Sequence, residues 1–247
     1  MLAVRNGLAV NLLLLLALLT VLDASPGIGG PAWVTGLTCG VAVTAAVAVG
    51  MPAFGARVLG PADLVTLTRL TLSCAVAALV AESFVRQLTG PTLVALATTA
   101  LALDAVDGQV ARRSHTLSRF GSRFDGEADA FLMLVLSVYV ARSAGGWVLA
   151  IGAARYLFAM AGWVLPWMRA QLPPRYWRKI VTAAAGIALA FAAADLGVPE
   201  ATYAALGVTL ALLTESFGRD VWWLWCHRLL EPVEVSTRVG RVRLPLP

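Results

Sequence analysis

Charged residues are scarce in this sequence. Of its 247 residues, 13% are charged and 59% are hydrophobic, and the mean hydropathy is +0.79. A soluble domain usually carries about 25% charged residues, so this composition excludes an ordinary soluble protein and indicates a protein embedded in a membrane. The long apolar runs are rich in Ala and Leu and do not alternate with polar residues, which disfavours a β-barrel and favours helices.

Cysteine and histidine are also rare. The three cysteines, Cys39, Cys74 and Cys226, are too far apart to form a disulfide framework or a metal-binding motif. The two histidines, His115 and His227, stand alone and do not indicate a histidine-ligated metal. The net charge of +5 comes from basic residues between the apolar runs. The sequence has no basic patch interleaved with aromatic residues, which argues against nucleic-acid binding.

Eight apolar runs are each long enough to cross a bilayer as a helix, which takes about 20 residues. Segments that contain Gly and Pro, such as SPGIGGP, TGP and LGVP, separate them. The sequence therefore predicts an all-α polytopic membrane protein, in which the short segment RSAGGW joins two helices as a hairpin. The predicted spans are 6–22, 32–50, 63–81, 91–111, 126–142, 145–166, 178–195 and 200–218.

The basic residues are distributed unevenly between the segments that connect these spans. Alternate segments hold fifteen of the 19 lysines and arginines, and the positive-inside rule places such segments in the cytoplasm. We therefore expect both termini and the charged segment 103–130 to be cytoplasmic. The first span resembles a signal peptide, but no small-residue cleavage site follows it, so we interpret it as a retained helix. The fifteen residues are Arg5, Arg57, Arg112, Arg113, Arg119, Arg123, Arg169, Arg175, Arg178, Lys179, Arg219, Arg228, Arg238, Arg241 and Arg243.

The charged segment contains four regularly spaced aspartates. Asp104 and Asp107 are three residues apart near the end of one predicted span, and Asp125 and Asp129 are four residues apart at the start of the next. Each spacing places both carboxylates of a pair on one face of a helix. Because a short loop joins the two helices, the two faces can meet just inside the membrane surface.

Four carboxylates in one place repel each other, and a carboxylate at bilayer depth costs about 2.5 kcal/mol or more. Divalent cations would offset both effects, and an oxygen-only ligand set suits magnesium, calcium or manganese. Such a cluster can hold two metal ions that clamp a phosphoryl group during in-line displacement. Gly108, Ala111 and Gly121 leave room for a nucleotide near the backbone, and Arg112 offers a planar guanidinium to phosphate oxygens.

Together these residues form the pattern Asp104-x-x-Asp107-Gly108-x-x-Ala111-Arg112, eight further residues, then Gly121-x-x-x-Asp125-x-x-x-Asp129. This pattern resembles the signature of the CDP-alcohol phosphotransferase (CDP-alcohol phosphatidyltransferase) family at all eight fixed positions. The resemblance extends over about residues 62–220. It implies a six-helix transmembrane core, preceded here by two extra N-terminal transmembrane helices. The corresponding regions are the N-terminal pair at 1–56, the catalytic core at 57–220, and an interfacial segment with a cytoplasmic tail at 221–247.

The resemblance also implies an activity and roles for the motif residues. The family transfers a substituted phosphoryl group from a CDP-alcohol, usually CDP-diacylglycerol, to an acceptor hydroxyl and releases CMP, and homodimers are common in it. Asp129 would be the general base. The residues implied in binding Mg²⁺ or Mn²⁺ are Asp104, Asp107, Asp125 and Asp129. The residues implied in binding the nucleotide are Gly108, Ala111, Arg112 and Gly121.

Three basic residues outside the motif are candidates for contacts with the acceptor. Arg155 lies near the middle of a predicted span, where an arginine is costly and usually lines a cavity; the alternative is an ion pair with Glu215. Arg178 and Lys179 start the next span, where they would either complete an anion pocket or anchor the helix at the cytoplasmic face. Their charge favours a phosphorylated polyol, such as inositol phosphate or glycerol phosphate, over serine or choline.

The segment PADLVTLTRL at the start of the third span matches part of an Asn-x-x-Thr-x-x-Arg pattern that many family members have. Thr66 and Arg69 keep this pattern and would support the active site, whereas Asp63 departs from it and can cap the helix. Two other functions stay open. A membrane transporter is disfavoured because the acids gather at one face of the membrane. A membrane protein that binds a metal or nucleotide without catalysis is disfavoured by the intact motif.

Overall fold

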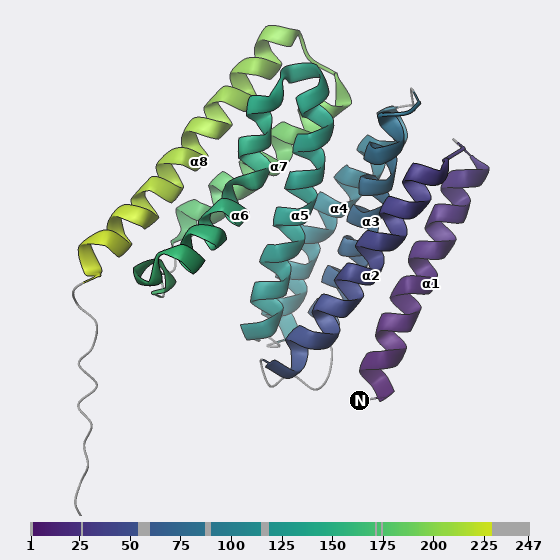
Figure 1. Cartoon of the computed structure of the whole chain (residues 1–247), viewed down its shortest axis with the longest axis horizontal. Coiled ribbons are helices and arrows are strands. Elements are labelled where there is room, and N and C mark those ends of the chain that lie inside the picture. Colours follow the sequence, from purple (N-terminus) through teal and green to yellow (C-terminus); the bar gives the residue numbers. More distant parts are fainter. Residues whose placement is uncertain are drawn as a thin grey trace, which may run out of the picture.

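The computed structural model is helical throughout the part of the chain that it describes, and that part contains no β-strand (Figure 1). It describes residues 2–25, 27–53, 60–86, 90–114, 119–170, 172–173 and 175–228. The side chains at 2–6, 53, 61–62, 105–114 and 119–120 lie outside this description. The all-α fold predicted from the apolar runs is confirmed.

Eight α-helices and two short 3₁₀ helices follow one another in the described residues. The long helices run in alternating directions, so that the start of α1, the end of α4, the start of α5 and the end of α8 lie toward the same end of the molecule (Figure 1). The bounds are α1 (Leu2–Ala24), α2 (Gly30–Ala53), α3 (Pro61–Ser83), α4 (Gly90–Ser114), α5 (Arg119–Ala144), η1 (Gly146–Val148), α6 (Leu149–Val164), η2 (Pro166–Arg169), α7 (Tyr176–Ala194) and α8 (Pro199–His227).

Helix α3 is the central helix of the bundle and packs against α1, α2, α4 and α5. Its membrane segment, Asp63–Ser83, is 72% buried within the protein, against 28% and 22% for the corresponding segments of α1 and α2. Small side chains make this possible, because the run from Ser73 to Ala78 lets neighbouring backbones approach closely. A side chain on α3 can therefore reach several other helices.

Five helical segments in the described part of the chain are long and apolar enough to cross a membrane, and they lie in α1, α2, α3, η1 together with α6, and α7. Helix α4 has a shorter apolar part, Gly90–Asp104, and α5 carries four charged residues between positions 123 and 129. Among the described residues, the helices that are not long and apolar enough to cross a membrane include α4 and α5, which carry the four motif aspartates. The chain is thus an integral membrane protein in which charge is concentrated at the ends of particular helices.

Two helices extend beyond the spans predicted for them. Helix α5 begins at Arg119 and not near 126, and α8 continues to His227 and not only to 218. The reason is that an apolar run marks the part of a helix inside the membrane, whereas the helix itself can continue into the polar interface. Helix α8 has no break at the boundary expected near residue 220, and the division into three regions stays a prediction.

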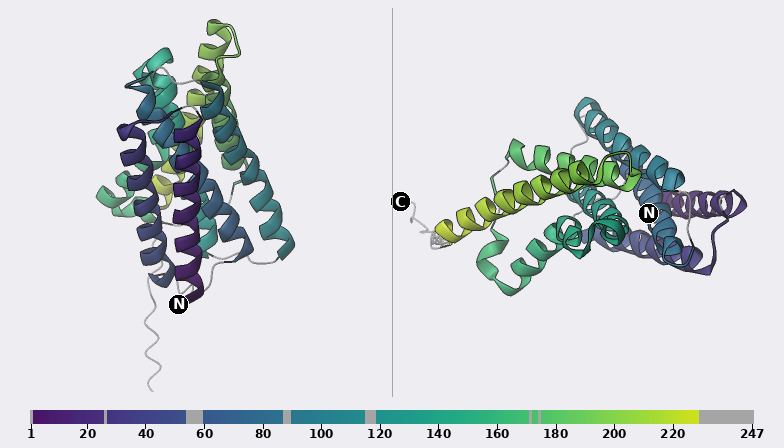
Figure 2. Two further views of the ribbon diagram at one scale, coloured as in Figure 1. Left: turned by 90° about the vertical axis from the view of Figure 1, so that its right-hand side faces the viewer. Right: turned by 90° about the horizontal axis from the view of Figure 1, so that it is seen from above.

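The helix ends are set by local chemistry that the sequence indicates. Gly145 has a φ of 98°, which favours glycine, and it turns the chain from α5 into η1 and α6 as the predicted hairpin. At the start of α3, the backbone N–H of Gly60 donates a 2.9 Å hydrogen bond to the Asp63 carboxylate, so Asp63 does cap this helix. Seen from above, the α1–α2 pair and the end of α8 lie on opposite sides of the bundle (Figure 2).

Candidate active site

Three of the four predicted metal ligands come together where α4 ends and α5 begins. Asp104 lies on α4, and Asp125 and Asp129 lie one turn apart on α5. One carboxylate oxygen of each residue lies within 4.8 Å of the others. The convergence expected from the helical spacing is therefore observed for these three residues, which we call the acidic cluster, while their roles stay predictions.

The remaining residues of the first half of the motif lie in α4 beyond Asp104. The side chains of these positions lie outside the described residues, so their predicted roles are neither supported nor opposed by contacts. They are Asp107, Gly108, Ala111 and Arg112. His115 lies outside the described residues entirely. In the second half of the motif, Gly121 lies one turn before Asp125 on α5.

Arg69 of α3 joins the three carboxylates of the acidic cluster. Its side chain is 2% exposed, and its guanidinium forms ion pairs with Asp104, Asp125 and Asp129. The pair with Asp129 joins Nη1 and Oδ1 at 3.0 Å, and Nη2 donates a 3.4 Å hydrogen bond to the backbone carbonyl of Asp125. Among these four residues, one buried cation thus faces three anions.

The neighbours of Arg69 on α3 are themselves buried and polar. Thr66, one turn earlier, is 3% exposed, and the hydroxyl of the buried Ser73 donates a 2.9 Å hydrogen bond to the Arg69 carbonyl. A planar guanidinium can contact several carboxylates at once, which a lysine ammonium does less well. The sequence predicted that Arg69 supports the site, and its contacts now provide a physical way to do so.

The acidic cluster fits a divalent cation by the chemistry of its donors. Three neighbouring carboxylates offer oxygen atoms only, which are the ligands that Mg²⁺ and Mn²⁺ prefer. The three aspartate side chains are between 28% and 41% exposed, whereas Arg69 is buried among them. A cation that approaches from outside can therefore reach carboxylate oxygens.

Arg155 of α6 lies against the first turns of α5. Its Nη2 is 2.8 Å from Oε1 of Glu127, and a Cβ at Gly126 would lie 3.1 Å from the same nitrogen. The structure places Glu127 beside Arg155, so the alternative of a pair with Glu215 is wrong, because the α5–α6 hairpin aligns these two helices. The Arg155 Nε is buried and has no hydrogen-bond partner within the described ranges, whereas the side chain as a whole is 40% exposed.

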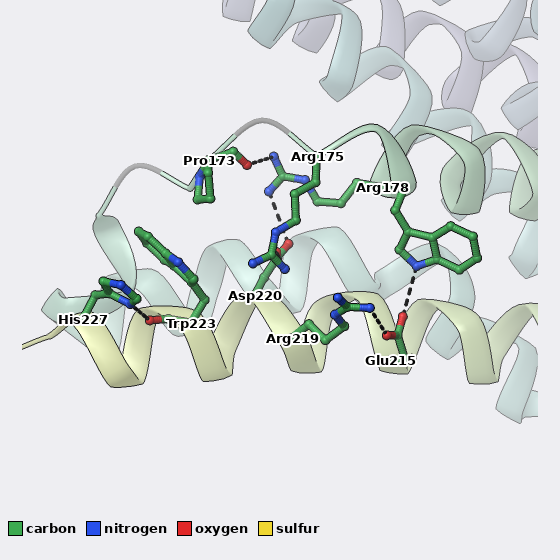
Figure 3. Close-up of polar contacts among 9 residues, drawn as sticks. Pro173, Arg175, Arg178, Glu215, Arg219, Asp220, Trp223 and His227 are labelled. Atoms are coloured by element: carbon green, nitrogen blue, oxygen red, sulfur yellow. Dashed lines mark hydrogen bonds and ion pairs between the residues drawn. The ribbon is translucent and has the colours of Figure 1, made fainter.

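A second group of charges lies between the start of α7 and the end of α8, and we call Arg175, Arg178 and Asp220 the α7–α8 cluster. The Asp220 side chain is 3% exposed, and its oxygens lie 3.2 Å from Arg178 Nη1 and 3.8 Å from Arg175 Nη1 (Figure 3). Arg178 Nη2 also donates a 3.5 Å hydrogen bond to the Pro173 carbonyl, and Lys179 is exposed. These contacts are structural, and the acceptor roles of Arg178 and Lys179 stay predictions.

The surroundings of the α7–α8 cluster are also paired. Glu215 accepts hydrogen bonds from Arg219 at 2.9 Å and from the Trp177 ring nitrogen at 3.1 Å (Figure 3). An open cavity of about 640 Å³ beside it is lined by Arg175 and by residues of α8, and includes none of the motif residues. This cavity is therefore separate from the acidic cluster.

Two acidic residues that organise these sites received no role from the sequence. Glu127 lies inside the motif region but outside the motif, and its spacing gives no sign of a partner on α6. Asp220 lies five positions after Glu215, in a helix end whose other charged residues are basic. This contrast in charge is the only feature of the sequence that could have indicated a role for it. Both are understood only when the partner helices are placed.

Comparisons with known proteins agree with this geometry. The family model described as CDP-alcohol phosphatidyltransferase matches residues 59–215, which include α3 to α7, both halves of the acidic motif and most of α8. No match was found among curated proteins or among solved structures. Helices α1 and α2 lie before the matched residues.

Proposed function

Because the chain belongs to the CDP-alcohol phosphatidyltransferase family, we propose that it transfers a phosphatidyl group from CDP-diacylglycerol, or a related substituted phosphoryl group from another CDP-alcohol, to an acceptor alcohol with release of CMP. This reaction is a step of phospholipid biosynthesis. The observation that carries the proposal is the convergence of Asp104, Asp125 and Asp129 from two helices around Arg69.

Dependence on a divalent metal is part of the proposal. Mg²⁺ or Mn²⁺ would be held by Asp104, Asp107, Asp125 and Asp129. When bound, the metal would offset the negative charge of the donor pyrophosphate and of the leaving CMP. Arg69 would hold the carboxylates of α4 and α5 in fixed positions relative to each other, which is supported by its contacts with both helices.

Asp129 is the proposed general base. The acceptor oxygen forms a bond to the phosphorus of the donor, the bond from that phosphorus to CMP breaks, and the acceptor proton moves to the Asp129 carboxylate. A carboxylate is a weak base for an alcohol, so the proton moves as the new bond forms and not before. The ion pair of Asp129 with Arg69, at 3.0 Å, holds the position of this carboxylate within the cluster.

The nucleotide of the donor would lie beside the small motif residues. Gly108, Ala111 and Gly121 would let it approach the helices closely, and Arg112 would contact its phosphates. Three of these positions lie on α4 and Gly121 lies near the start of α5. They therefore flank the same end of the bundle as the acidic cluster.

The acceptor is proposed to be a phosphorylated polyol, such as inositol phosphate or glycerol phosphate. Arg155 is the leading candidate for the phosphate contact, since it lies beside Gly126, the residue after Asp125, and its side chain is partly exposed. Glu127 holds the other side of its guanidinium at 2.8 Å. Arg178 and Lys179 would add positive charge further away.

We place the active site and both termini on the cytoplasmic side of the membrane. The support is the distribution of basic residues, because the positive-inside rule assigns segments rich in arginine to the cytoplasm. The starts of α1 and α5 and the ends of α4 and α8 all lie at one end of the molecule (Figure 1), as this topology requires.

The proposal is tested by measuring CMP release from CDP-diacylglycerol. The full chain, purified in detergent or in nanodiscs, is incubated with Mg²⁺ or Mn²⁺ and, one at a time, inositol phosphate, glycerol phosphate, inositol, serine and choline. We expect CMP to appear only with metal and with one of the two phosphorylated acceptors. CMP release with serine or choline alone would reject the acceptor assignment, and no CMP with any acceptor would reject the transferase itself.

A further inference from the structure

We propose that the N-terminal helix pair α1–α2 is a positioning element of the active site, and that Asn11 is its key positioning residue. The pair lies before the matched family residues 59–215, so the family core does not account for it. In this chain it holds α3, and through α3 it holds Arg69 against the acidic cluster. The inference rests on the proposed function, since it concerns the placement of residues for that reaction.

The first observation is a buried polar contact between α1 and α3. The Thr71 hydroxyl donates a hydrogen bond to the Asn11 side-chain carbonyl, and these residues are only 5% and 4% exposed. Thr71 also lies 3.1 Å from the Leu67 carbonyl, one turn earlier on α3. A polar contact in an apolar interior fixes the register of two helices, because sliding or rotation leaves its groups unpaired.

The position of this contact connects it to the site. Thr71 and Leu67 lie two residues after and two residues before Arg69, and Ser73 bonds the Arg69 carbonyl at 2.9 Å. Asn11 therefore holds the turn of α3 that carries the buried guanidinium. A rotation of α3 by a small angle would move all three ion pairs of Arg69 together.

The second observation is an apolar cluster at the same end of the molecule. Leu8 of α1, Val47 and Met51 of α2 and Leu67 of α3 are buried together, and Phe124 of α5 packs against them. Phe124 directly precedes Asp125. The N-terminal pair thus contacts both partners of the ion-pair network, α3 beside Arg69 and α5 beside Asp125.

The third observation concerns the opposite end of α3, where Glu82 lies close to Gly29, the residue before α2. Glu82 is 0% exposed, and a Cβ at Gly29 would lie 2.8 Å from its carboxylate, so Gly29 and the Glu82 side chain lie close together. Contacts along the whole length of α3 leave the helix little freedom to move relative to the pair. The pair is therefore a rigid support, and not merely a membrane anchor.

The experiment separates positioning from stability in the full-length protein. Asn11→Leu removes the acceptor, Asn11→Leu with Thr71→Val replaces both polar partners, and Leu22→Ala is a control that removes buried side chain near the far end of α1. Three properties are measured: the melting temperature in detergent, the affinity for Mn²⁺ alone by calorimetry, and CMP release.

We expect Asn11→Leu to weaken Mn²⁺ binding and to lower kcat by about three- to tenfold each, the range that one hydrogen bond supplies. The double variant should recover the melting temperature, since replacing both partners by apolar groups can be nearly neutral, but not the Mn²⁺ affinity or kcat. Leu22→Ala should lower the melting temperature and leave the Mn²⁺ affinity as in the parent protein.

Several results would overturn the inference: unchanged or tighter Mn²⁺ binding in Asn11→Leu, recovery of Mn²⁺ affinity together with the melting temperature in the double variant, or equal weakening by Leu22→Ala. If Asn11→Leu cannot be purified, the double variant alone decides between positioning and stability. If the parent protein binds Mn²⁺ but releases no CMP, the proposed function fails while the Mn²⁺ affinities still test Asn11. If the parent protein is active and the Asn11 variants match it, the inference alone fails.

Discussion

The acidic cluster and the α7–α8 cluster are built from the same residue types in opposite arrangements. In the acidic cluster the buried member is a cation, Arg69, and the three aspartates around it are partly exposed. In the α7–α8 cluster the buried member is an anion, Asp220, and Arg175 and Arg178 are partly exposed. The buried residue organises each group, and the exposed residues determine which ligand charge it can attract.

This comparison explains why only one of the two groups carries the proposed chemistry. Among the three carboxylates and one guanidinium of the acidic cluster, negative charges outnumber positive ones, which suits a divalent cation. Two arginines around one carboxylate, with Glu215 and Arg219 paired next to them, leave a smaller excess of positive charge. The following changes test this difference, from the largest expected effect to the smallest.

Asp129→Asn should lower kcat by about 10²- to 10⁴-fold, because a positioned general base contributes that much. Binding of Mn²⁺ and of the donor should remain largely intact, since Asp104 and Asp125 keep their charges. Turnover is measured as CMP release and binding by calorimetry. Glu215→Gln removes the same charge outside the acidic cluster and serves as the control, and near-normal turnover in Asp129→Asn would remove Asp129 from the role of base.

Arg69→Met should lower the free energy of unfolding by about 3–5 kcal/mol, the usual cost of breaking a buried ion pair by removing one partner. The three carboxylates would then lose the guanidinium that they share. Arg69→Lys keeps the charge but not the planar geometry, so its loss should be intermediate. Denaturant or thermal unfolding in detergent measures both. If Arg69→Met were as stable as the parent protein, Arg69 would not organise the cluster.

Arg155→Met should raise the KM for a phosphorylated acceptor by about 10- to 100-fold, which corresponds to the loss of a hydrogen bond to a charged group. The KM for CDP-diacylglycerol should change little. Arg178→Met is the matched variant in the α7–α8 cluster, and its effect should be smaller because Arg178 contacts α8, whereas Arg155 lies against the turn of α5 that carries Asp125. Steady-state kinetics with varied acceptor concentration shows which variant has the higher KM. A larger effect for Arg178→Met would mean that the α7–α8 cluster, and not Arg155, contacts the acceptor.

Asp220→Asn should lower the free energy of unfolding by only about 1 kcal/mol, because Arg175 and Arg178 are partly exposed and can turn to water. The same unfolding assay as for Arg69→Met gives the direct contrast. If Asp220→Asn destabilises the protein as strongly as Arg69→Met, the two clusters do not differ in the way described above.

The part of the site that follows helical periodicity could be predicted from the sequence. Asp104, Asp125 and Asp129 converge because a spacing of four residues places Asp125 and Asp129 on one helix face, and because α4 and α5 follow each other closely in the sequence. The eight helices and the Gly145 hairpin follow in the same way from apolar runs and turn residues. These features depend on residues that are close together in the sequence, and the spacing of those residues predicts them.

Contacts between helices distant in the chain could not be predicted. Arg69 lies 35 residues before Asp104 and 56 before Asp125, so its place at the centre of the cluster depends on how α3 packs. The pairing of Arg155 with Glu127 and not with Glu215 depends likewise on which helix lies beside α6. The end of α8 was placed too early because hydropathy falls before the helix ends.

The ion pairs of Arg69 also have a consequence for the order in which the protein is made. In a chain synthesised from its N-terminus, α3 with Arg69 reaches the membrane before α4 and α5, which carry its three carboxylate partners. Helices α1 and α2 are already available at that moment, and Asn11 and Leu8 offer α3 a place to dock. The arrival of α4 and then α5 brings the three carboxylates to Arg69, so the acidic cluster can assemble before α6, α7 and α8 have been added.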